Sequence, residues 1–448
     1  MSRIRQWLFD ARQRLLFLPA VFTVFGVVAA IAAVSVDQFA VSGDDLPRMF
    51  RTSVDGGRQV LSTIATGLIS AFALLLSLTL VAVQLASSQF SPRTVRNWLG
   101  DRILQRAIGL ILGTVVFCLV VLYQTRSLGE NDAFQPHLSV LAGIIMGLSA
   151  LVVVLRAVDH LADSMRVGAV AQTILAETLA LAHRVAEEPP IDRPGVNPSP
   201  HPVEGAPRTP PAGARIVEAG RAGWVQEIDV EALLEACPDG ATLHVPVAVG
   251  AFTLSRAPLA WISPTTTARP MDELEAAVRD AIVIGDVRTM RQDLGFGIVR
   301  LVDMALRALS PSMNDANTAK DVIAHLGEVL LAVLANPERK GVRTAAGRRV
   351  TSTEYSHAEY VHAAFDQIRL SAISQPQALI TLVRTLRTVR QEVERRSLPA
   401  EVSAIDELMA EIADDVRGSA LSERDQRRVL EVMADEDRSP EAQPDPIR

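Results

Sequence analysis

Cysteine is nearly absent from this sequence, which excludes a fold held together by disulfides. Cys118 and Cys237 are the only two cysteines among 448 residues, and they lie far apart in the chain. No cysteine or histidine pair has the short spacing that is typical of a metal site. We therefore expect no metal centre and no cofactor.

The sequence also lacks a basic cluster. Its formal net charge is -7 at pH 7, and no run of Lys and Arg stands out in the polar part of the chain. Proteins that bind nucleic acids generally carry a basic patch or stripe that matches the phosphate backbone. We therefore expect no nucleic-acid partner.

Charged side chains are missing from the interior of four long apolar segments. The hydrocarbon core of a bilayer is about 30 Å thick, and a helix of roughly 20 apolar residues crosses it. Each segment is close to that length, so the sequence predicts an integral membrane protein whose first partner is the lipid bilayer. The segments are Leu15–Val36, Val60–Val83, Ala107–Tyr123 and Leu138–Leu155.

Arginines between the apolar segments predict the orientation of the chain. Ten lie before the first segment, between the second and third, and after the fourth, whereas four lie in the other two loops. Loops rich in Lys and Arg stay in the cytoplasm. We therefore expect a multi-pass protein of the cell inner membrane with cytoplasmic N- and C-termini. The first segment is longer than the apolar core of a signal peptide, so we expect it to be retained.

The fold class expected from these patterns is an α-helical membrane protein with four transmembrane helices and a cytoplasmic α+β region. Helical periodicity continues beyond the fourth segment, then nine prolines interrupt it. The expected parts are a transmembrane domain with a cytoplasmic helix extension at 1–186, a Pro-rich linker at 187–213, a small β-rich module at 214–264, a helical domain at 265–436 and a disordered tail at 437–448.

Within the β-rich module, short β-like runs surround one helix that Asp229 is expected to cap. The helical domain is expected to begin with an amphipathic helix over residues 272–284. It is also expected to contain a hairpin over residues 341–353, with Gly347 near its turn. The remaining segments up to residue 434 have the periodicity of a helical bundle.

A polar stripe follows the second apolar segment. Its members recur at steps of three or four residues or at sums of such steps, so they share one helix face. Small hydroxyl side chains in lipid serve close helix packing, and they also line water-filled paths. Both interpretations stay open for the candidate pore-facing residues, which are Thr63, Thr66, Ser70, Ser77 and Gln84.

Small residues also mark one face of the third and fourth segments, where glycines allow two helix backbones to approach closely. They are Gly109 and Gly113, then Ser139, Gly143 and Gly147. Small residues on three helices suggest a homo-oligomer. The absence of acids and bases inside the segments argues against a proton-coupled transporter.

The densest polar region lies at residues 288–321. Four charged residues fall on one face of the helix expected at 294–309, and opposite signs alternate along it. Asp303 and Arg307 are spaced to form an i,i+4 ion pair. The four are Asp293, Arg300, Asp303 and Arg307.

The turn SPSMND follows this helix and presents Asn314 and Asp315 at the start of the next one. Asn314 is expected to be the N-cap. The whole region is interpreted either as a structural network of ion pairs and caps or as a site for a ligand or a subunit contact. No nucleophile with a base accompanies it, so we expect no catalytic residue.

Two stretches, at residues 72–109 and 291–319, resemble the bacterial family of predicted membrane proteins called domain of unknown function 2254. One departure is visible, because Ala316 stands where the family turn SP-x-INDP has proline. Proline at the first helical position favours helix initiation, so its absence softens the turn. The resemblance implies a membrane location and no established activity.

Two hypotheses for the function follow. The first is a homo-oligomeric, channel-like or pore-forming protein, lined by the second helix and regulated by the cytoplasmic part. The alternative is a non-conducting sensor or scaffold whose cytoplasmic domain binds a ligand or a partner. Enzymatic activity has little support. The first hypothesis requires the polar stripe to face an oligomer axis, and the second is favoured if one subunit buries the stripe.

Overall fold

The computed structural model describes residues 17–39, 53–89, 101–128, 137–164, 167–187, 209–210, 213–263, 270–336, 342–345 and 347–434. The chain divides into two compact units, Met1–Ala169 and Val170–Arg448. Nearly all of the predicted linker at 187–213 and the whole predicted tail at 437–448 lie outside the described residues.

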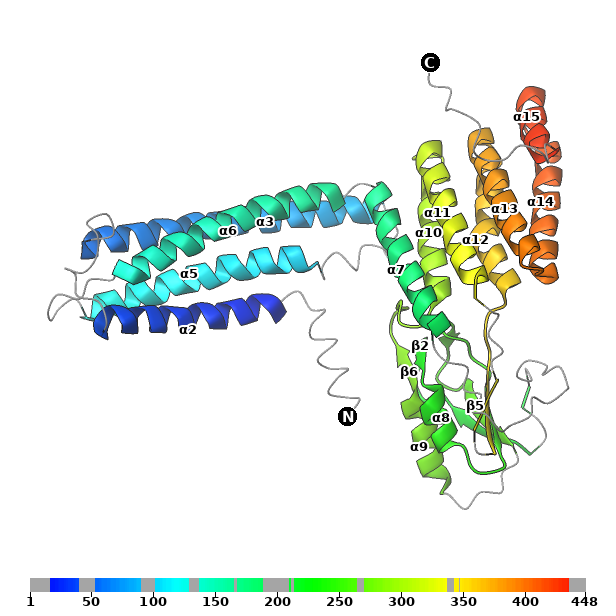
Figure 1. The fold of residues 1–448 in the computed structure, drawn as a ribbon, viewed down its shortest axis with the longest axis horizontal. Coiled ribbons are helices and arrows are strands. Elements are labelled where there is room, and N and C mark those ends of the chain that lie inside the picture. Colours follow the sequence, from blue (N-terminus) through cyan, green and yellow to red (C-terminus); the bar gives the residue numbers. More distant parts are fainter. Residues whose placement is uncertain are drawn as a thin grey trace. The chain divides into compact units, whose positions relative to one another are not determined.

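The first unit consists of helices that run side by side (Figure 1). Among the residues described, four helices are long and apolar enough to cross a membrane, as predicted. Exposed leucine, valine and isoleucine side chains cover much of their outer surface, as lipid contact requires. The helices are α2 (Phe17–Phe39), α3 (Val54–Gln89), α5 (Arg102–Leu128) and α6 (His137–Ser164).

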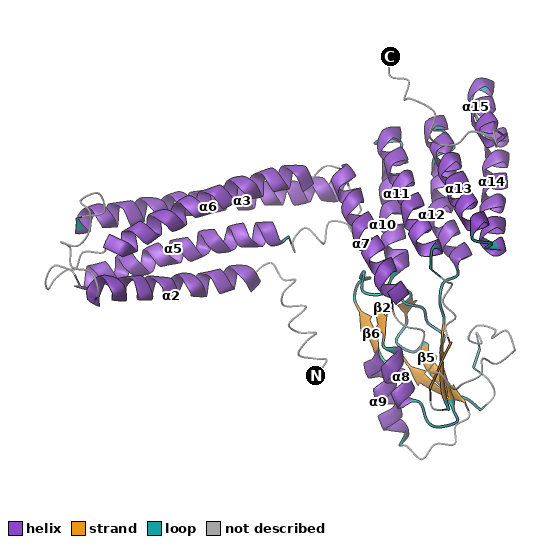
Figure 2. Ribbon diagram, viewed as in Figure 1, coloured by secondary structure: helices purple, strands orange, loops and turns teal. Residues whose placement is uncertain are grey.

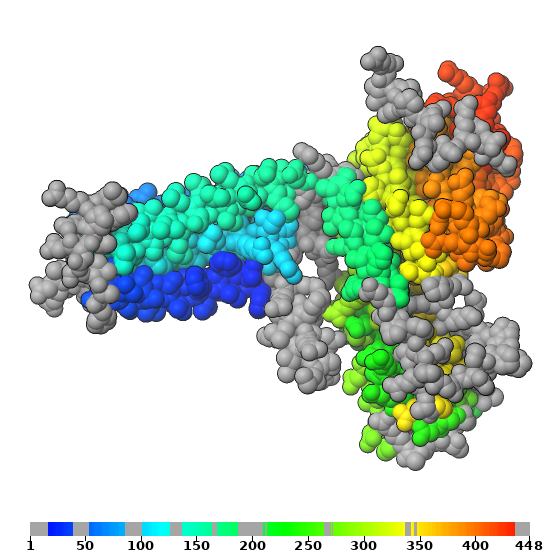
Figure 3. All heavy atoms as spheres, viewed as in Figure 1, coloured from blue at the N-terminus to red at the C-terminus, as the bar shows by residue number. Residues whose placement is uncertain are grey.

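Glycines bring these helices into close contact inside one copy of the chain. A Cβ atom on Gly26 of α2 would lie 2.2 Å from the carbonyl oxygen of Gly113 on α5. On α6, a Cβ on Gly143 would lie 2.5 Å from the Leu61 side chain of α3. The small residues of the third and fourth segments therefore pack within the bundle. They give no support to the expected homo-oligomer. Figure 3 shows α2, α5 and α6 packed against one another.

Carboxylates fix both ends of α6. Asp37, near the end of α2, is buried, and its two oxygens accept hydrogen bonds from the backbone N–H groups of Leu138 and Ser139, each at 2.9 Å. At the other end, Nε2 of His160 lies 2.6 Å from Oδ2 of Asp101. Asp37 thus satisfies N–H groups in the first turn of α6, a role usually filled by the residue just before the helix.

The second unit contains α7 (Val167–Glu187) for most of its length, two β-sheets and a helical bundle (Figure 2). The larger sheet has the order β1-β5-β3-β8-β7, in which β3 and β8 are parallel and the other pairs antiparallel. Its strands are Arg215–Glu218, Pro258–Ser263, Thr242–Val245, Arg348–Ser352 and Val342–Ala345, in that order.

The smaller sheet has the order β4-β2-β6, from Phe252–Thr253, Gly223–Ile228 and Ile282–Gly285. The helix predicted over 272–284 was wrong at its end, because α9 (Met271–Ala281) stops and β6 follows. The sequence Ile-Val-Ile-Gly favours a strand through its β-branched residues, and pairing with β2 satisfies its backbone.

Both sheets use residues outside the range 214–264. The predicted hairpin forms as β7 and β8 with Gly347 at a φ of 78°, and β8 pairs with β3. The core beneath the sheet includes Leu243, Ile262 and Val350, together with residues of α8 (Val230–Ala236) and α9. Asp229 caps α8 as predicted, accepting from the N–H of Ala232.

The helical bundle predicted for the rest of the chain is confirmed (Figure 1). Ser356 and Glu359 form a capping box at the start of α12, in which each side chain accepts from the backbone N–H of the other residue. The helices are α10 (Leu294–Leu309), α11 (Ala316–Leu334), α12 (His357–Ser371), α13 (Pro376–Arg395), α14 (Pro399–Gly418) and α15 (Glu423–Ala434).

Candidate functional site

The polar stripe on α3 points away from the body of the single chain. Every candidate pore-facing residue is exposed, whereas Leu61, Leu68 and Leu75 on the opposite face are buried in the bundle. The described helices of the first unit therefore do not bury the stripe. The exposed residues are Thr63, Thr66, Ser70, Ser77 and Gln84.

Two hydroxyls of the stripe are hydrogen-bonded to their own helix. Thr63 donates to the carbonyl of Gln59 at 2.7 Å, and Ser70 donates to that of Thr66 at 3.1 Å. A hydroxyl bonded in this way still has lone pairs that accept hydrogen bonds. The stripe can therefore contact lipid, a second helix or water without leaving these two donors unpaired.

In the second unit, Asp293 is the N-cap of α10 and not a member of its charged face. It accepts a hydrogen bond from the N–H of Phe296 at 2.9 Å. The guanidinium of Arg288 binds both of its oxygens, at 2.8 and 3.0 Å. Burial raises the pKa of the Asp293 carboxyl above its usual range, and Arg288 partly opposes that effect. The Arg288–Asp293 pair thus fixes the start of α10.

Aromatic rings and a glycine enclose this pair. The Arg288 guanidinium carbon lies 5.5 Å from the centre of the Trp224 ring and 5.4 Å from that of Phe296, within the range of cation–π attraction. Gly250 has a φ of 86°, and a Cβ there would lie 2.2 Å from Oδ2 of Asp293. Arg288, Trp224 and Gly250 were not among the residues predicted for the site.

Arg300 serves a different contact. Its side chain is only 3% exposed, and its Nη1 lies 2.7 Å from Oε2 of Glu177 on α7. One turn away, Gly297 makes room for Thr178. A Cβ atom on Gly297 would lie 2.2 Å from the hydroxyl oxygen of Thr178. Arg300 and Gly297 therefore hold α7 against α10.

Asn314 and Asp315 lie at the other end of α10. This helix has 16 residues, so its ends are about 24 Å apart at 1.5 Å per residue. The predicted N-cap was wrong by one position, because Asp315 accepts from the N–H groups of Asn317 and Thr318. Asn314 instead has a φ of 48°, which asparagine tolerates, and it accepts from Gln375. Asp303 and Arg307 are both half-buried, and their mutual pairing stays a prediction.

Replacing Asp315 with alanine is expected to destabilise the second unit by about 1 kcal/mol, because an N-cap is lost. Thr318 holds the pKa of this carboxyl below its usual range through a hydrogen bond, so part of the loss should appear when wild type is acidified through that lowered pKa. Thermal unfolding of the purified full chain measures both effects. Asn314→Gly is the control and should change stability by only a few tenths of a kcal/mol, since glycine accepts a positive φ. Equal losses in both variants would contradict the assignment of Asp315.

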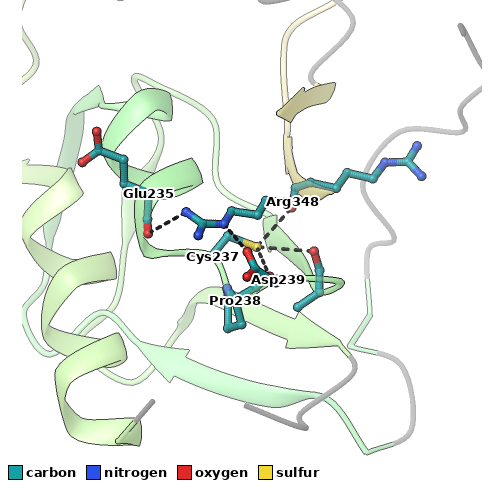
Figure 4. Close-up of polar contacts among 7 residues, drawn as sticks. Glu235, Cys237, Pro238, Asp239 and Arg348 are labelled. Carbon is teal, nitrogen blue, oxygen red and sulfur yellow. Dashed lines mark hydrogen bonds and ion pairs between the residues drawn. The ribbon is translucent and has the colours of Figure 1, made fainter. Parts of the chain in front are cut away.

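Two further polar contacts connect distant parts of the second unit. His357, at the start of α12, is buried, and its Nδ1 lies 2.9 Å from Oε1 of the buried Glu401 on α14. Figure 4 shows Arg348 of β8 reaching Asp239, while the sulfur of Cys237 lies 3.4 Å from the carbonyl oxygen of Ala241. Burial raises the pKa of the Cys237 thiol, and a protonated thiol is a poor nucleophile.

No three His, Cys, Asp or Glu side chains of the described part of the chain are grouped so that they could hold a metal ion. The residues predicted for one cytoplasmic site thus lie in two separate arrangements at the two ends of α10, and Arg300 between them contacts α7. In the arrangement around Asp293, the guanidinium of Arg288 is the counter-ion of the carboxylate and holds it in place.

Comparison with known proteins gives a family and no activity. Residues 12–388 match the family described as predicted membrane protein (DUF2254). Uncharacterised proteins of Mycobacterium bovis and of two Mycobacterium tuberculosis strains are each 30% identical to the chain over 350 residues. Each match covers 77% of this chain but only 65% of the relative's length. No solved structure matches the chain.

Proposed function

The chain belongs to the DUF2254 family of predicted membrane proteins, and on that premise we propose that its copies associate through α3 to form a channel-like path across the bilayer. The proposal keeps the cell inner membrane as the location, with both termini cytoplasmic, as the arginine asymmetry predicts. It assigns no catalytic role to the chain.

The observation that carries this proposal is the exposure of the α3 stripe. A polar face with no partner in its own bundle meets either lipid or another copy. Ser70 and Ser77 lie well inside the second predicted segment, Val60–Val83, where lipid offers no hydrogen-bond partner to a hydroxyl. In an oligomer, the same hydroxyls would face the symmetry axis and replace part of an ion's hydration shell.

The second unit is proposed to regulate the path. The helix of the fourth span, α6, ends at Ser164, and α7 begins at Val167, so few residues separate this helix from the second unit. The Glu177–Arg300 contact fixes α7 to α10. A change in the bundle that moves α7 would therefore act on the end of the fourth span.

A non-conducting sensor or scaffold is the second candidate. It is favoured by the hydrogen bonds from Thr63 and Ser70 to their own helix, because these bonds let the stripe lie in lipid or in a dry interface. In that case, α3 would hold copies together, and the second unit would carry the binding function.

Ion flux distinguishes the two candidates. We expect liposomes containing the wild-type chain to conduct small ions, and the variant Ser70→Leu/Ser77→Leu to lose most of the flux, because an apolar constriction closes a path by dewetting. The measurement is flux across a panel of small anions and cations, with oligomer size determined in parallel.

Ser149→Leu is the matched control. Ser149 on α6 is also exposed and donates to its own helix, to the carbonyl of Ile145 at 2.7 Å, but it lies outside the stripe. This variant should conduct like wild type. No wild-type flux for any ion would favour the scaffold, and normal flux through a folded double variant would remove the α3 face from the path.

A further inference from the structure

The edge of the smaller sheet carries an exposed apolar surface. In β4 and the residue after it, Phe252 and Leu254 are 54% and 66% exposed, while Thr253 between them is buried. Alternate residues of a strand point to the same side, so both large side chains share the outer face. We call Phe252 and Leu254, together with Arg221 and Arg256, the β4 surface.

The backbone beneath the β4 surface is well ordered by hydrogen bonds. Ala257 N–H donates to the carbonyl of Leu254 at 3.0 Å, which closes a turn, and Gly220 N–H donates to the carbonyl of Ser255 at 2.8 Å. The Phe252 ring packs edge-on against Trp224 with centroids 5.3 Å apart. The apolar side chains are thus held outward on a fixed frame, and little conformational entropy is lost when they bind.

The charge of this surface is basic, although the whole chain is acidic. Segments 219–225 and 250–258, which form it, contain Arg221 and Arg256 and no acidic residue. Arg256 is exposed, and among the described residues it has no ion-pair partner. Arg221 pairs with Asp286, but both side chains are largely exposed, so that pair is weak.

We propose that the β4 surface docks reversibly on the anionic lipid surface of the membrane that the chain spans. Aromatic and leucine side chains enter the headgroup boundary, and arginines beside them bind anionic headgroups. Two apolar side chains alone bind a bilayer weakly. Here α6, the helix of the fourth span, ends at Ser164 and the second unit begins at Val170, so the surface is tethered near the membrane and acts at a high effective concentration.

A fluorophore attached beside the surface tests this proposal in the full chain. Cys118 and Cys237 are both buried, so a cysteine introduced by Ser255→Cys can be labelled selectively. Ser371→Cys is the matched control, because Ser371 is an exposed serine next to Leu370, which is 59% exposed. Each labelled chain is reconstituted in phosphatidylcholine vesicles, with or without phosphatidylglycerol, that contain nitroxide-labelled lipid as the quencher.

We expect lipid quenching at residue 255 and not at residue 371, and the quenching should increase with phosphatidylglycerol. Arg256→Gln should lower the ratio of docked to undocked chains about fivefold, the effect of one arginine near an anionic surface. Phe252→Ser should abolish quenching at 255. Equal quenching at both positions would overturn the proposal. A second result would also overturn it: a fluorophore at residue 255 that aqueous iodide cannot quench and that nitroxide-labelled lipid does not quench either. That result would indicate a protein partner such as a second copy.

Discussion

Replacing Arg288 with alanine is expected to lower the unfolding free energy of the second unit by about 3–5 kcal/mol, the usual cost of leaving a buried charge without its partner. Asp293 is 3% exposed and depends on Arg288 for two hydrogen bonds. Thermal or denaturant unfolding of the full chain in detergent, followed by a probe in the second unit, measures the loss. Arg291→Ala is the control. The Arg291–Glu227 pair is partly exposed, so we expect a loss of about 0–1 kcal/mol.

The pH dependence provides an independent check. In the folded wild type, burial raises the pKa of Asp293 above its unfolded value. The folded state then binds the extra proton, so this group lowers stability as pH rises through the interval between the two pKa values. Without Arg288, the pKa of Asp293 in the folded state should rise further, which extends this interval to higher pH. The stability difference between wild type and the Arg288→Ala variant should therefore be smaller in acid than at neutral pH. Adding Asp293→Asn should restore stability, and a loss that survives this second change would contradict the explanation.

Replacing Gly26 with alanine is expected to destabilise the membrane bundle by about 1–3 kcal/mol through overpacking. The new methyl would meet the carbonyl of Gly113 at 2.2 Å, and that contact is backbone, so no side chain can move aside. The helices α2 and α5 must then separate or shift. Unfolding of the purified chain in detergent, followed by a probe in the first unit, measures the effect.

Gly67→Ala is the control for this prediction. Gly67 lies on α3 within a predicted span, and apart from its chain neighbours and the backbone of its own helix no atom lies within 4 Å of the position that a Cβ would occupy. We expect its effect to stay within about 0.5 kcal/mol, as for other open surface sites. Alanine has a higher helix propensity than glycine, so propensity opposes any loss. Similar losses in both variants would therefore contradict the assignment of the effect to the α2–α5 contact.

Local patterns predicted the membrane part of the fold well. Bilayer thickness sets a minimum length for a spanning helix, so the four apolar segments identify α2, α3, α5 and α6 directly. The same patterns did not show where each small residue faces. Gly113 and Gly143 turned out to serve contacts inside one copy, while the hydroxyls of the predicted stripe on α3 face outward.

Contacts between distant residues could not be predicted from one sequence. Glu177 and Arg300 are separated by 123 positions, and neither stands out as half of a pair. Asp37 lies just beyond the first apolar segment, and no local pattern indicates that its carboxylate accepts from N–H groups at the start of α6, 101 and 102 positions away. At the SPSMND turn, the type of element was right, but the cap moved by one residue because Asn314 takes a left-handed conformation.

The parallel pairing of β3 with β8 also constrains how the chain can fold during synthesis. His244 and its neighbour Thr351 on β8 are 107 residues apart, and α9, α10 and α11 are made between them. At 5–20 residues per second, β3 must wait about 5–20 s for its partner. During that time the edge of β3 is unpaired and open to other chains. A chaperone bound to this edge would protect it until the ribosome has released the β7–β8 hairpin.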